Sequence, residues 1–250
     1  MFPYRDENDT QRPAIVTGVL IAICCFVWIF VQGAGLGRAL PASVCNLGLI
    51  PGELTGLLPP GVGFPIGNGL VCLTDPGPQY VHIFTSMFLH GGWMHLLGNM
   101  WFLWLFGNNI EDSMTRPRFV VFYLICGMAA AFAQILTDPA SRIPMVGASG
   151  AISGVMGAYL ILFPRVRVWT FVPIIIFLTS FPLPAWVMLL YWFFLQIAGG
   201  LTGMGAGGVA VWAHVGGFLA GVILIKLFVV RSNLDAHRAG HWRPDRIGWN

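Results

Sequence analysis

The sequence predicts an all-α membrane protein with six transmembrane helices and a long first loop on the outer side. Of its 250 residues, 56% are hydrophobic and only 9% are charged. A soluble domain carries about 25% charged residues, so this chain lacks the polar surface that a globule needs in water. Backbone groups that cross a bilayer must be paired within their own segment, which favours helices. The net charge of +3 gives no basis for a nucleic-acid partner, so the expected partner is the lipid bilayer.

Six apolar ranges approach the length of about 20 residues that a transmembrane helix requires. The first of them is long for a signal peptide and follows an acidic tail, so we interpret it as a retained anchor. We expect one membrane domain over 14–230, between cytoplasmic tails at 1–13 and 231–250. The predicted spans are about 14–32, 92–109, 118–136, 149–163, 185–199 and 209–230.

The distribution of Lys and Arg predicts the orientation. With six spans and an inner N-terminus, eleven of the 13 cations lie on the inner side, as the positive-inside bias favours, and only Arg38 and Arg142 lie outside. Counting the apolar stretch Val168–Phe181 as a seventh span would place the C-terminal cations outside. We therefore predict that this stretch is interfacial or re-entrant. The N- and C-termini are expected in the cytoplasm.

The loop between the first two spans, from Gly33 to about Gly91, contains seven prolines, which excludes one long helix there. Cys45 and Cys72 both fall in this loop. In an oxidising compartment they could form a disulfide. They could equally be two unrelated thiols, and the sequence leaves both alternatives open.

A few polar side chains lie within the predicted spans, where such groups are costly and are therefore functional candidates. His95 and Asn99 are four residues apart and share one helix face. Ser149 opens the fourth span and His214 lies near the start of the sixth. Both spans enter the membrane from the outer side, which places the two residues at a depth of about 7–8 Å. A hydroxyl beside an imidazole is typical of acyl transfer, because the imidazole can accept the proton of the nucleophile.

Small residues follow both of these candidates. The fourth span continues with Gly150 and Gly154, and the sixth carries Gly217 and Gly221. Such spacing lets helix backbones approach closely, so the two spans are predicted to be neighbours. A helix N-terminus at Ser149 could donate N–H groups to an oxyanion. No carboxylate lies at this depth, which favours a Ser–His dyad over a triad.

Three motifs, in order, resemble the rhomboid intramembrane serine proteases: His90-Gly-Gly-Trp-Met-His95-Leu-Leu-Gly-Asn99, Gly147-Ala-Ser149-Gly150 and Ala213-His214-Val-Gly-Gly217-Phe-Leu-Ala-Gly221. The resemblance runs from about Phe84 to Val230 and includes Glu111-Asp112. It implies that Ser149 is the nucleophile and His214 the general base. It also implies an oxyanion hole formed by His95, Asn99 and the Ser149 amide, with supporting roles for His90, Gly147, Gly150, Gly217 and Gly221. Transmembrane proteins would be the substrates, with no metal and no cofactor.

Two positions depart from the family pattern. Val81-His82-Ile83 stands in the first loop where many members carry a Trp-Arg pair. Ser153 stands where some members place a Tyr that stacks on the histidine. The first departure leaves the anchoring of the loop open. The second leaves open which groups hold His214.

Two other functions are alternatives to proteolysis. The first is a catalytically inactive rhomboid-like membrane chaperone or client-binding protein, but Ser149 and His214 are both present. The second is a metal site of His90, His95 and His214, but no His-Glu-x-x-His helix accompanies these histidines. We expect an intramembrane serine endopeptidase in the plasma membrane of a bacterium, with its active site opening to the outer side. The sequence does not specify the oligomeric state.

Overall fold

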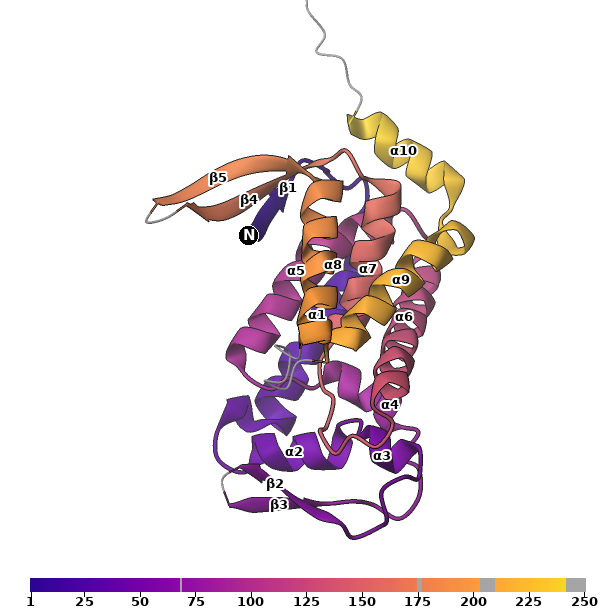
Figure 1. Cartoon of the computed structure of the whole chain (residues 1–250). Helices are drawn as coiled ribbons and strands as arrows, with labels where there is room; N and C mark the ends of the chain where they lie inside the picture. Colours follow the sequence, from indigo (N-terminus) through magenta and orange to yellow (C-terminus); the bar gives the residue numbers. More distant parts are fainter. Residues whose placement is uncertain (68, 175–176, 203–209, 242–250) are drawn as a thin grey trace, which may run out of the picture.

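A computed structural model describes residues 1–67, 69–174, 177–202 and 210–241 as a helix bundle with a small β-sheet at each end (Figure 1). Each range predicted to be a span contains a helix. Within the described ranges, three helices are long and apolar enough to cross a membrane: Arg116–Thr137, Ala185–Thr202 and Val211–Phe228. Ile15–Val31 and Ser149–Leu162 are shorter apolar helices. The bundle consists of α1 (Ile15–Phe26) with its π-helical extension η1 (Val27–Val31), α5 (Trp93–Asp112), α6 (Arg116–Thr137), α7 (Ser149–Leu162), α8 (Ala185–Thr202) and α9 (Val211–Phe228).

The bundle is built around α7, which is almost entirely buried and packs against α5, α6, α8 and α9. Its glycines allow the backbone of α9 to lie directly on it. A Cβ atom on Gly217 would overlap the carbonyl oxygen of Gly150, and one on Gly221 would overlap that of Gly154. The two helices therefore touch through their backbones, as the small-residue spacing predicts.

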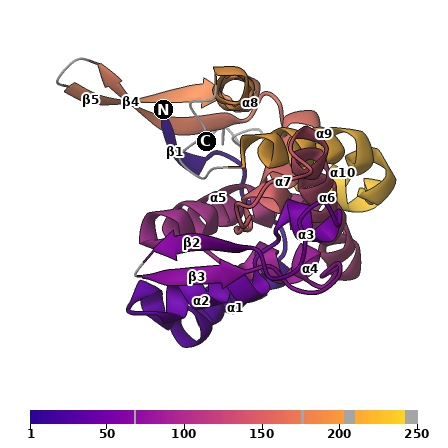
Figure 2. The ribbon, with the colours of Figure 1, turned by 60° about the horizontal axis from the view of Figure 1, so that its bottom comes forward.

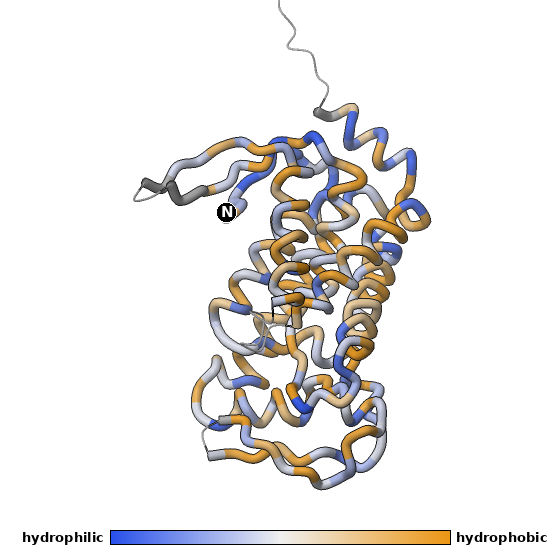
Figure 3. The backbone as a smooth tube through the Cα atoms, viewed as in Figure 1, coloured by the Kyte–Doolittle hydropathy of each residue, from blue (hydrophilic) through white to orange (hydrophobic). Residues whose placement is uncertain are grey.

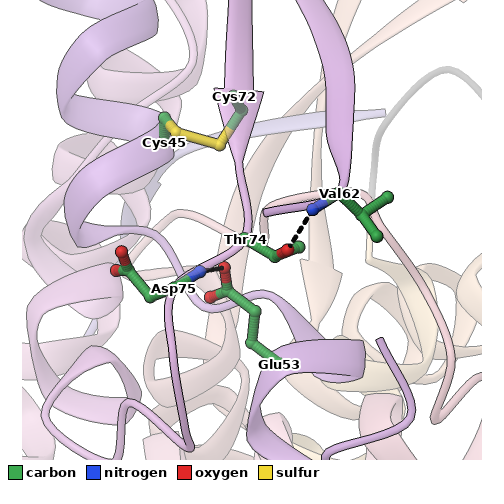
Figure 4. Close-up of a disulfide and its surroundings, with 6 residues drawn as sticks. All are labelled: Cys45, Glu53, Val62, Cys72, Thr74 and Asp75. Carbon is green, nitrogen blue, oxygen red and sulfur yellow. Dashed lines mark hydrogen bonds between the residues drawn. A yellow bond between two sulfur atoms is a disulfide. The ribbon is translucent and has the colours of Figure 1, made fainter. Parts of the chain in front are cut away.

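One end of the bundle, here called the loop end, is formed by the segment between α1 and α5. Figure 2 shows its strands lying across this end. Cys45 of α2 and Cys72 of β3 are joined by a disulfide, and the Glu53 carboxylate accepts the N–H of Asp75 at 2.9 Å (Figure 4). The segment comprises η2 (Gly33–Gly35), α2 (Ala39–Leu47), α3 (Pro51–Leu54), β2 (Gly63–Gly67), β3 (Leu70–Leu73), α4 (His82–Thr85) and η3 (Ser86–Phe88).

The loop end is anchored without a Trp-Arg pair. Leu49 and Met145 exchange two backbone hydrogen bonds, of 3.0 and 2.8 Å. Leu49 also packs with Ile135 of α6, and Ile83 covers this small apolar cluster. The Thr85 hydroxyl donates to the carbonyl of Leu47 at 2.6 Å. Apolar packing and backbone pairing thus fix the loop at the position where the sequence departs from the family pattern.

The opposite end, here called the sheet end, carries an antiparallel sheet of order β1-β4-β5, formed by β1 (Phe2–Asp6), β4 (Arg167–Ile174) and β5 (Phe177–Pro184). The hairpin of β4 and β5 occupies the stretch Val168–Phe181, which was predicted to be interfacial or re-entrant. The β structure of this stretch was not foreseen. The stretch is rich in β-branched and aromatic residues and contains Pro173, all of which favour extended backbone over helix. Figure 1 shows the sheet projecting sideways from the bundle.

Both predicted tails contribute buried residues at the sheet end. His237, in α10 (Arg231–His241), is fully buried. Its Nδ1 lies 2.6 Å from Asp112 Oδ2, and its Nε2 lies 2.9 Å from Asn8 Oδ1. Figure 3 shows hydrophilic residues gathered on α10 and around the base of the sheet, beside the mostly hydrophobic bundle. Residues 1–14 and helix α10 are therefore docked parts of the fold.

Candidate active site

Ser149 and His214 lie side by side at the loop end of α7 and α9. Ser149 Oγ is 2.8 Å from His214 Nε2, a normal hydrogen-bond distance. The close backbone contact of α7 with α9 brings the two residues together across 65 positions of sequence. Since a hydroxyl can donate to an unprotonated ring nitrogen, the pair has the geometry of a nucleophile and its base.

Ser149 is the first residue of α7, and the backbone before it is in a conformation that favours glycine. Gly147 has φ +126°. A Cβ atom there would lie 2.7 Å from His95 Nε2 and 3.5 Å from Ser149 Oγ. Gly147 therefore lets the His95 ring approach the serine. The N–H groups of the first turn of α7 have no partner within the helix, so the helix N-terminus favours negative charge beside Ser149.

The tautomer of His95 follows from its neighbour. The backbone N–H of Gly91 donates to His95 Nδ1 at 3.2 Å. Because Nδ1 accepts, the proton of the neutral ring is on Nε2, which is the nitrogen near Gly147 and Ser149. His95 can therefore donate a hydrogen bond into the site.

Asn99 lies one helical turn after His95 on the same face of α5. It is buried, and its Nδ2 has no hydrogen-bond partner among the described residues. A buried amide without a partner costs free energy unless a ligand uses it. His95, Asn99, Ser149 and His214 all line one cavity of about 820 Å³, whose other walls are largely apolar side chains of α5, α7 and α8. The structure thus brings these four predicted residues together.

His90 lies behind His95. It is fully buried, and the two rings are 5.3 Å apart with a T-shaped contact. The side chain of Gln32, which follows η1, forms two hydrogen bonds with the backbone of His90. Gln32 Oε1 accepts the His90 N–H, and Gln32 Nε2 donates to the His90 carbonyl, both at 2.8 Å. His90 is therefore a packing partner of His95, and Gln32 is a support that sequence reasoning missed.

His214 is held by two residues of α8. Its Nδ1 is 2.8 Å from Gln196 Oε1, and its ring centroid is 5.9 Å from that of Trp192. Ser153, at the position where some members carry Tyr, instead donates its hydroxyl to the Ser149 carbonyl at 2.6 Å. Neither Gln196 nor Trp192 was predicted from the sequence. The available signal was a single amide side chain within an otherwise apolar helix.

Glu111 and Asp112 lie at the sheet end, far along α5 from the cavity. Glu111 binds the first turn of α1 and Asp112 binds His237, so neither supplies a third member to the dyad. Within the described ranges, no group of three or more His, Cys, Asp or Glu side chains is arranged to hold a metal ion.

Comparison of the sequence with known proteins identifies a family. A family model described as a rhomboid domain matches residues 77–231. Rhomboid protein 1, mitochondrial, of Saccharomyces cerevisiae is 32% identical over 172 residues, which is 65% of this chain and 47% of the yeast protein. Putative rhomboid protease YdcA of Bacillus subtilis is 33% identical over 84 residues, covering 34% of this chain and 42% of YdcA. Rhomboid protease GluP of the same organism is 35% identical over 82 residues, covering 33% and 16%.

The chain spans about half or less of the length of these relatives. Two of them are named as proteases, which supports intramembrane proteolysis at the level of the family. Others are named as mitochondrial or chloroplastic proteins. The apolar helices and the rhomboid domain together identify an integral membrane protein. Because the family model covers more than half of the sequence, this chain belongs to the rhomboid family.

Proposed function

We propose that the chain is an intramembrane serine endopeptidase that cleaves transmembrane proteins with a dyad of Ser149 and His214. The observation that carries the proposal is the 2.8 Å distance between Ser149 Oγ and His214 Nε2 at the wall of a large cavity. The rhomboid domain and the protease-named relatives support the same reaction class.

The reaction begins with Ser149 Oγ attacking the carbonyl carbon of the scissile peptide bond. His214 Nε2 accepts the hydroxyl proton and then gives it to the leaving amine, which leaves an acyl ester on Ser149. A water molecule, deprotonated by His214, attacks this ester and releases the new carboxyl end. The proton returns to Ser149, so the dyad ends in its starting state.

The negative oxygen of each tetrahedral intermediate needs hydrogen-bond donors that are already in place. Three donors are available in the cavity that Ser149 lines. They are the Ser149 N–H at the start of α7, Nε2–H of His95 and Nδ2 of Asn99, which has no hydrogen-bond partner among the described residues. All three belong to helices α5 and α7, so they are in place before the reaction begins.

The cavity supports a peptide substrate. Its volume of about 820 Å³ exceeds that of one side chain. Its lining combines three glycines before and within α5 with apolar side chains such as Phe102, Ile152 and Met156. Glycines let an extended backbone approach the donors, and an apolar wall suits residues of a membrane segment. A transmembrane protein unwound near the membrane surface meets both conditions.

We also propose that the sheet end faces the cytoplasm of a bacterial cell and that the active site opens to the outer side. The structure gathers Arg5, Arg167 and Arg238 at the sheet end, which agrees with the positive-inside bias. The loop end carries the disulfide, which persists in an oxidising compartment. Cysteine substitution at Ser232 of α10, followed by labelling of intact cells with a membrane-impermeant reagent, tests this. Labelling without lysis would contradict the orientation.

The reaction is tested with the purified protein in detergent and a transmembrane substrate bearing a fluorophore and a quencher. We expect cleavage by the wild type and none by Ser149→Ala or His214→Ala. Ser232→Ala removes an exposed hydroxyl of α10, remote from the cavity, and serves as the matched control with unchanged cleavage.

A fluorophosphonate probe separates protease from chaperone. We expect the probe to label the wild type and Ser232→Ala, but not Ser149→Ala, because only an activated serine reacts. A wild type that captures the substrate, resists the probe and leaves the peptide intact would be a client-binding protein, and the proposal would be wrong.

A further inference from the structure

Gln196 is an uncharged polar side chain within α8, a helix that is otherwise almost wholly apolar. A polar group in such a segment is costly unless it is hydrogen-bonded. Gln196 is half-buried, and its Oε1 lies 2.8 Å from His214 Nδ1 on the neighbouring helix α9. The partner of this amide is thus the ring that contacts Ser149.

The chemistry of this contact fixes the state of the ring. An amide oxygen can only accept, so His214 Nδ1 must donate and carries the proton of the neutral imidazole. Nε2 is then unprotonated and can accept the proton of Ser149 Oγ, 2.8 Å away. In the other tautomer, Nε2 would carry the proton and the serine would lose its base.

A second residue of α8 fixes the plane of the same ring. Trp192 precedes Gln196 by four residues and therefore lies on the same face of the helix. Its ring is 5.9 Å from that of His214, with an interplanar angle of 37°. Trp192 thus restricts rotation of the imidazole, while Gln196 selects its tautomer.

We propose that Gln196 is the positioning residue for His214, a role that rests on the proposed proteolysis. It does the work that a carboxylate performs in a serine triad, but without a negative charge in the membrane region. Because it is on α8, the base is correctly set only while α8 lies against α9 at its observed position. Gln196 is a positioning residue and not a catalytic one, since it does not itself line the cavity and acts on Ser149 only through His214.

The proposal is tested with three variants. Gln196→Met keeps the length of the side chain but removes the acceptor, and we expect kcat to fall at least about tenfold with KM within about twofold. Gln196→Glu keeps an acceptor oxygen and is expected to recover most of kcat. Tyr191→Phe removes a polar atom from the exposed side of the same helix and should leave kcat unchanged. Wild-type kcat in Gln196→Met would overturn the proposal.

Nitrogen-15 NMR of protein labelled at histidine gives a readout that does not depend on cleavage. The His214 signals, assigned by their loss in His214→Asn, should show Nδ1 protonated in the wild type and in Gln196→Glu. Gln196→Met should show a mixture of both tautomers. A single Nδ1-protonated ring in Gln196→Met would overturn the positioning role. A wild type with the expected tautomer but no proteolysis would instead contradict only the proposed function.

Discussion

The carboxylate of Glu111, at the end of α5, caps the first turn of α1 by binding Thr17. Its Oε2 accepts the Thr17 backbone N–H at 2.8 Å and the Thr17 hydroxyl at 2.9 Å, and its Oε1 accepts the N–H of Val16 at 2.9 Å. A negative charge at a helix N-terminus is favourable, and these N–H groups have no partner within the helix. The family motif Glu111-Asp112 is therefore explained by folding.

We expect Glu111→Ala to lower the free energy of unfolding by about 2–3 kcal/mol, because buried N–H groups of α1 lose their acceptor. Glu111→Gln keeps one acceptor oxygen, replaces the other by a donor NH2 group and removes the charge, so its free energy of unfolding should lie between those of Glu111→Ala and the wild type. Thermal unfolding in detergent micelles measures both. An unchanged melting temperature in Glu111→Ala would contradict the capping role.

Gly217→Ala and Gly221→Ala should both destabilise the bundle strongly. The added Cβ atoms would meet backbone carbonyls of Gly150 and Gly154, which cannot move aside as a flexible side chain could. We expect each variant to lose stability by more than about 2 kcal/mol and to lose cleavage, since α7 and α9 carry the two members of the dyad. Gly18→Ala in α1 is the control, because its Cβ would meet nothing within 4 Å. Equal melting temperatures for all three variants would refute the close packing.

Asn99→Ala should lower kcat without abolishing cleavage. Removing one oxyanion donor costs about 10²-fold in a serine hydrolase, and two other donors remain. The same assay that is used for Ser149→Ala measures this. A wild-type kcat in Asn99→Ala would show that Asn99 is not a donor of the oxyanion hole.

Asp6 predicts a pH-dependent stability at the sheet end. Burial raises the pKa of Asp6 to about 6, and the hydrogen bonds from Tyr159 and Asn109 offset this only in part. The folded state therefore binds more protons than the unfolded state, so stability falls as pH rises from about 4 to about 6. Asp6→Asn keeps an acceptor for both donors but cannot ionise.

We expect Asp6→Asn to melt at a higher temperature than the wild type at pH 7–8, with the difference shrinking as the pH approaches 4. Melting curves of both proteins between pH 4 and pH 8 measure this difference. A difference that stays constant with pH would mean that Asp6 is not the titrating group.

The Cys45–Cys72 pair should resist thiol reagents until it is reduced. We expect a maleimide to label these two positions only after treatment with reductant, and Cys45→Ser to lower the melting temperature, because the bridge closes a loop across 27 positions. Equal labelling before and after reduction would show that no bridge forms in the membrane-bound protein.

The sequence predicted the helices and the four central site residues because their signals are local or follow a family motif. Ser149 and His214 follow from their matched depth and the small-residue spacing of their spans, and His95 and Asn99 from helical periodicity. Gln196 was missed because only ionisable groups in the spans were taken as functional candidates. A neutral amide can nevertheless fix the tautomer of His214. The hairpin of β4 and β5 was missed because apolar residues near a membrane resemble a buried helix until their pairing partner is known.

The pairing of β1 with β4 has a consequence for the order of assembly during synthesis. Residues 2–6 leave the ribosome about 160 residues before their partners at 168–171, and the His237 that binds Asn8 comes later still. The N-terminal strand must therefore wait unpaired while α1 to α7 insert. Closing such distant contacts is slow, so the sheet end is completed only after α10 has been synthesised.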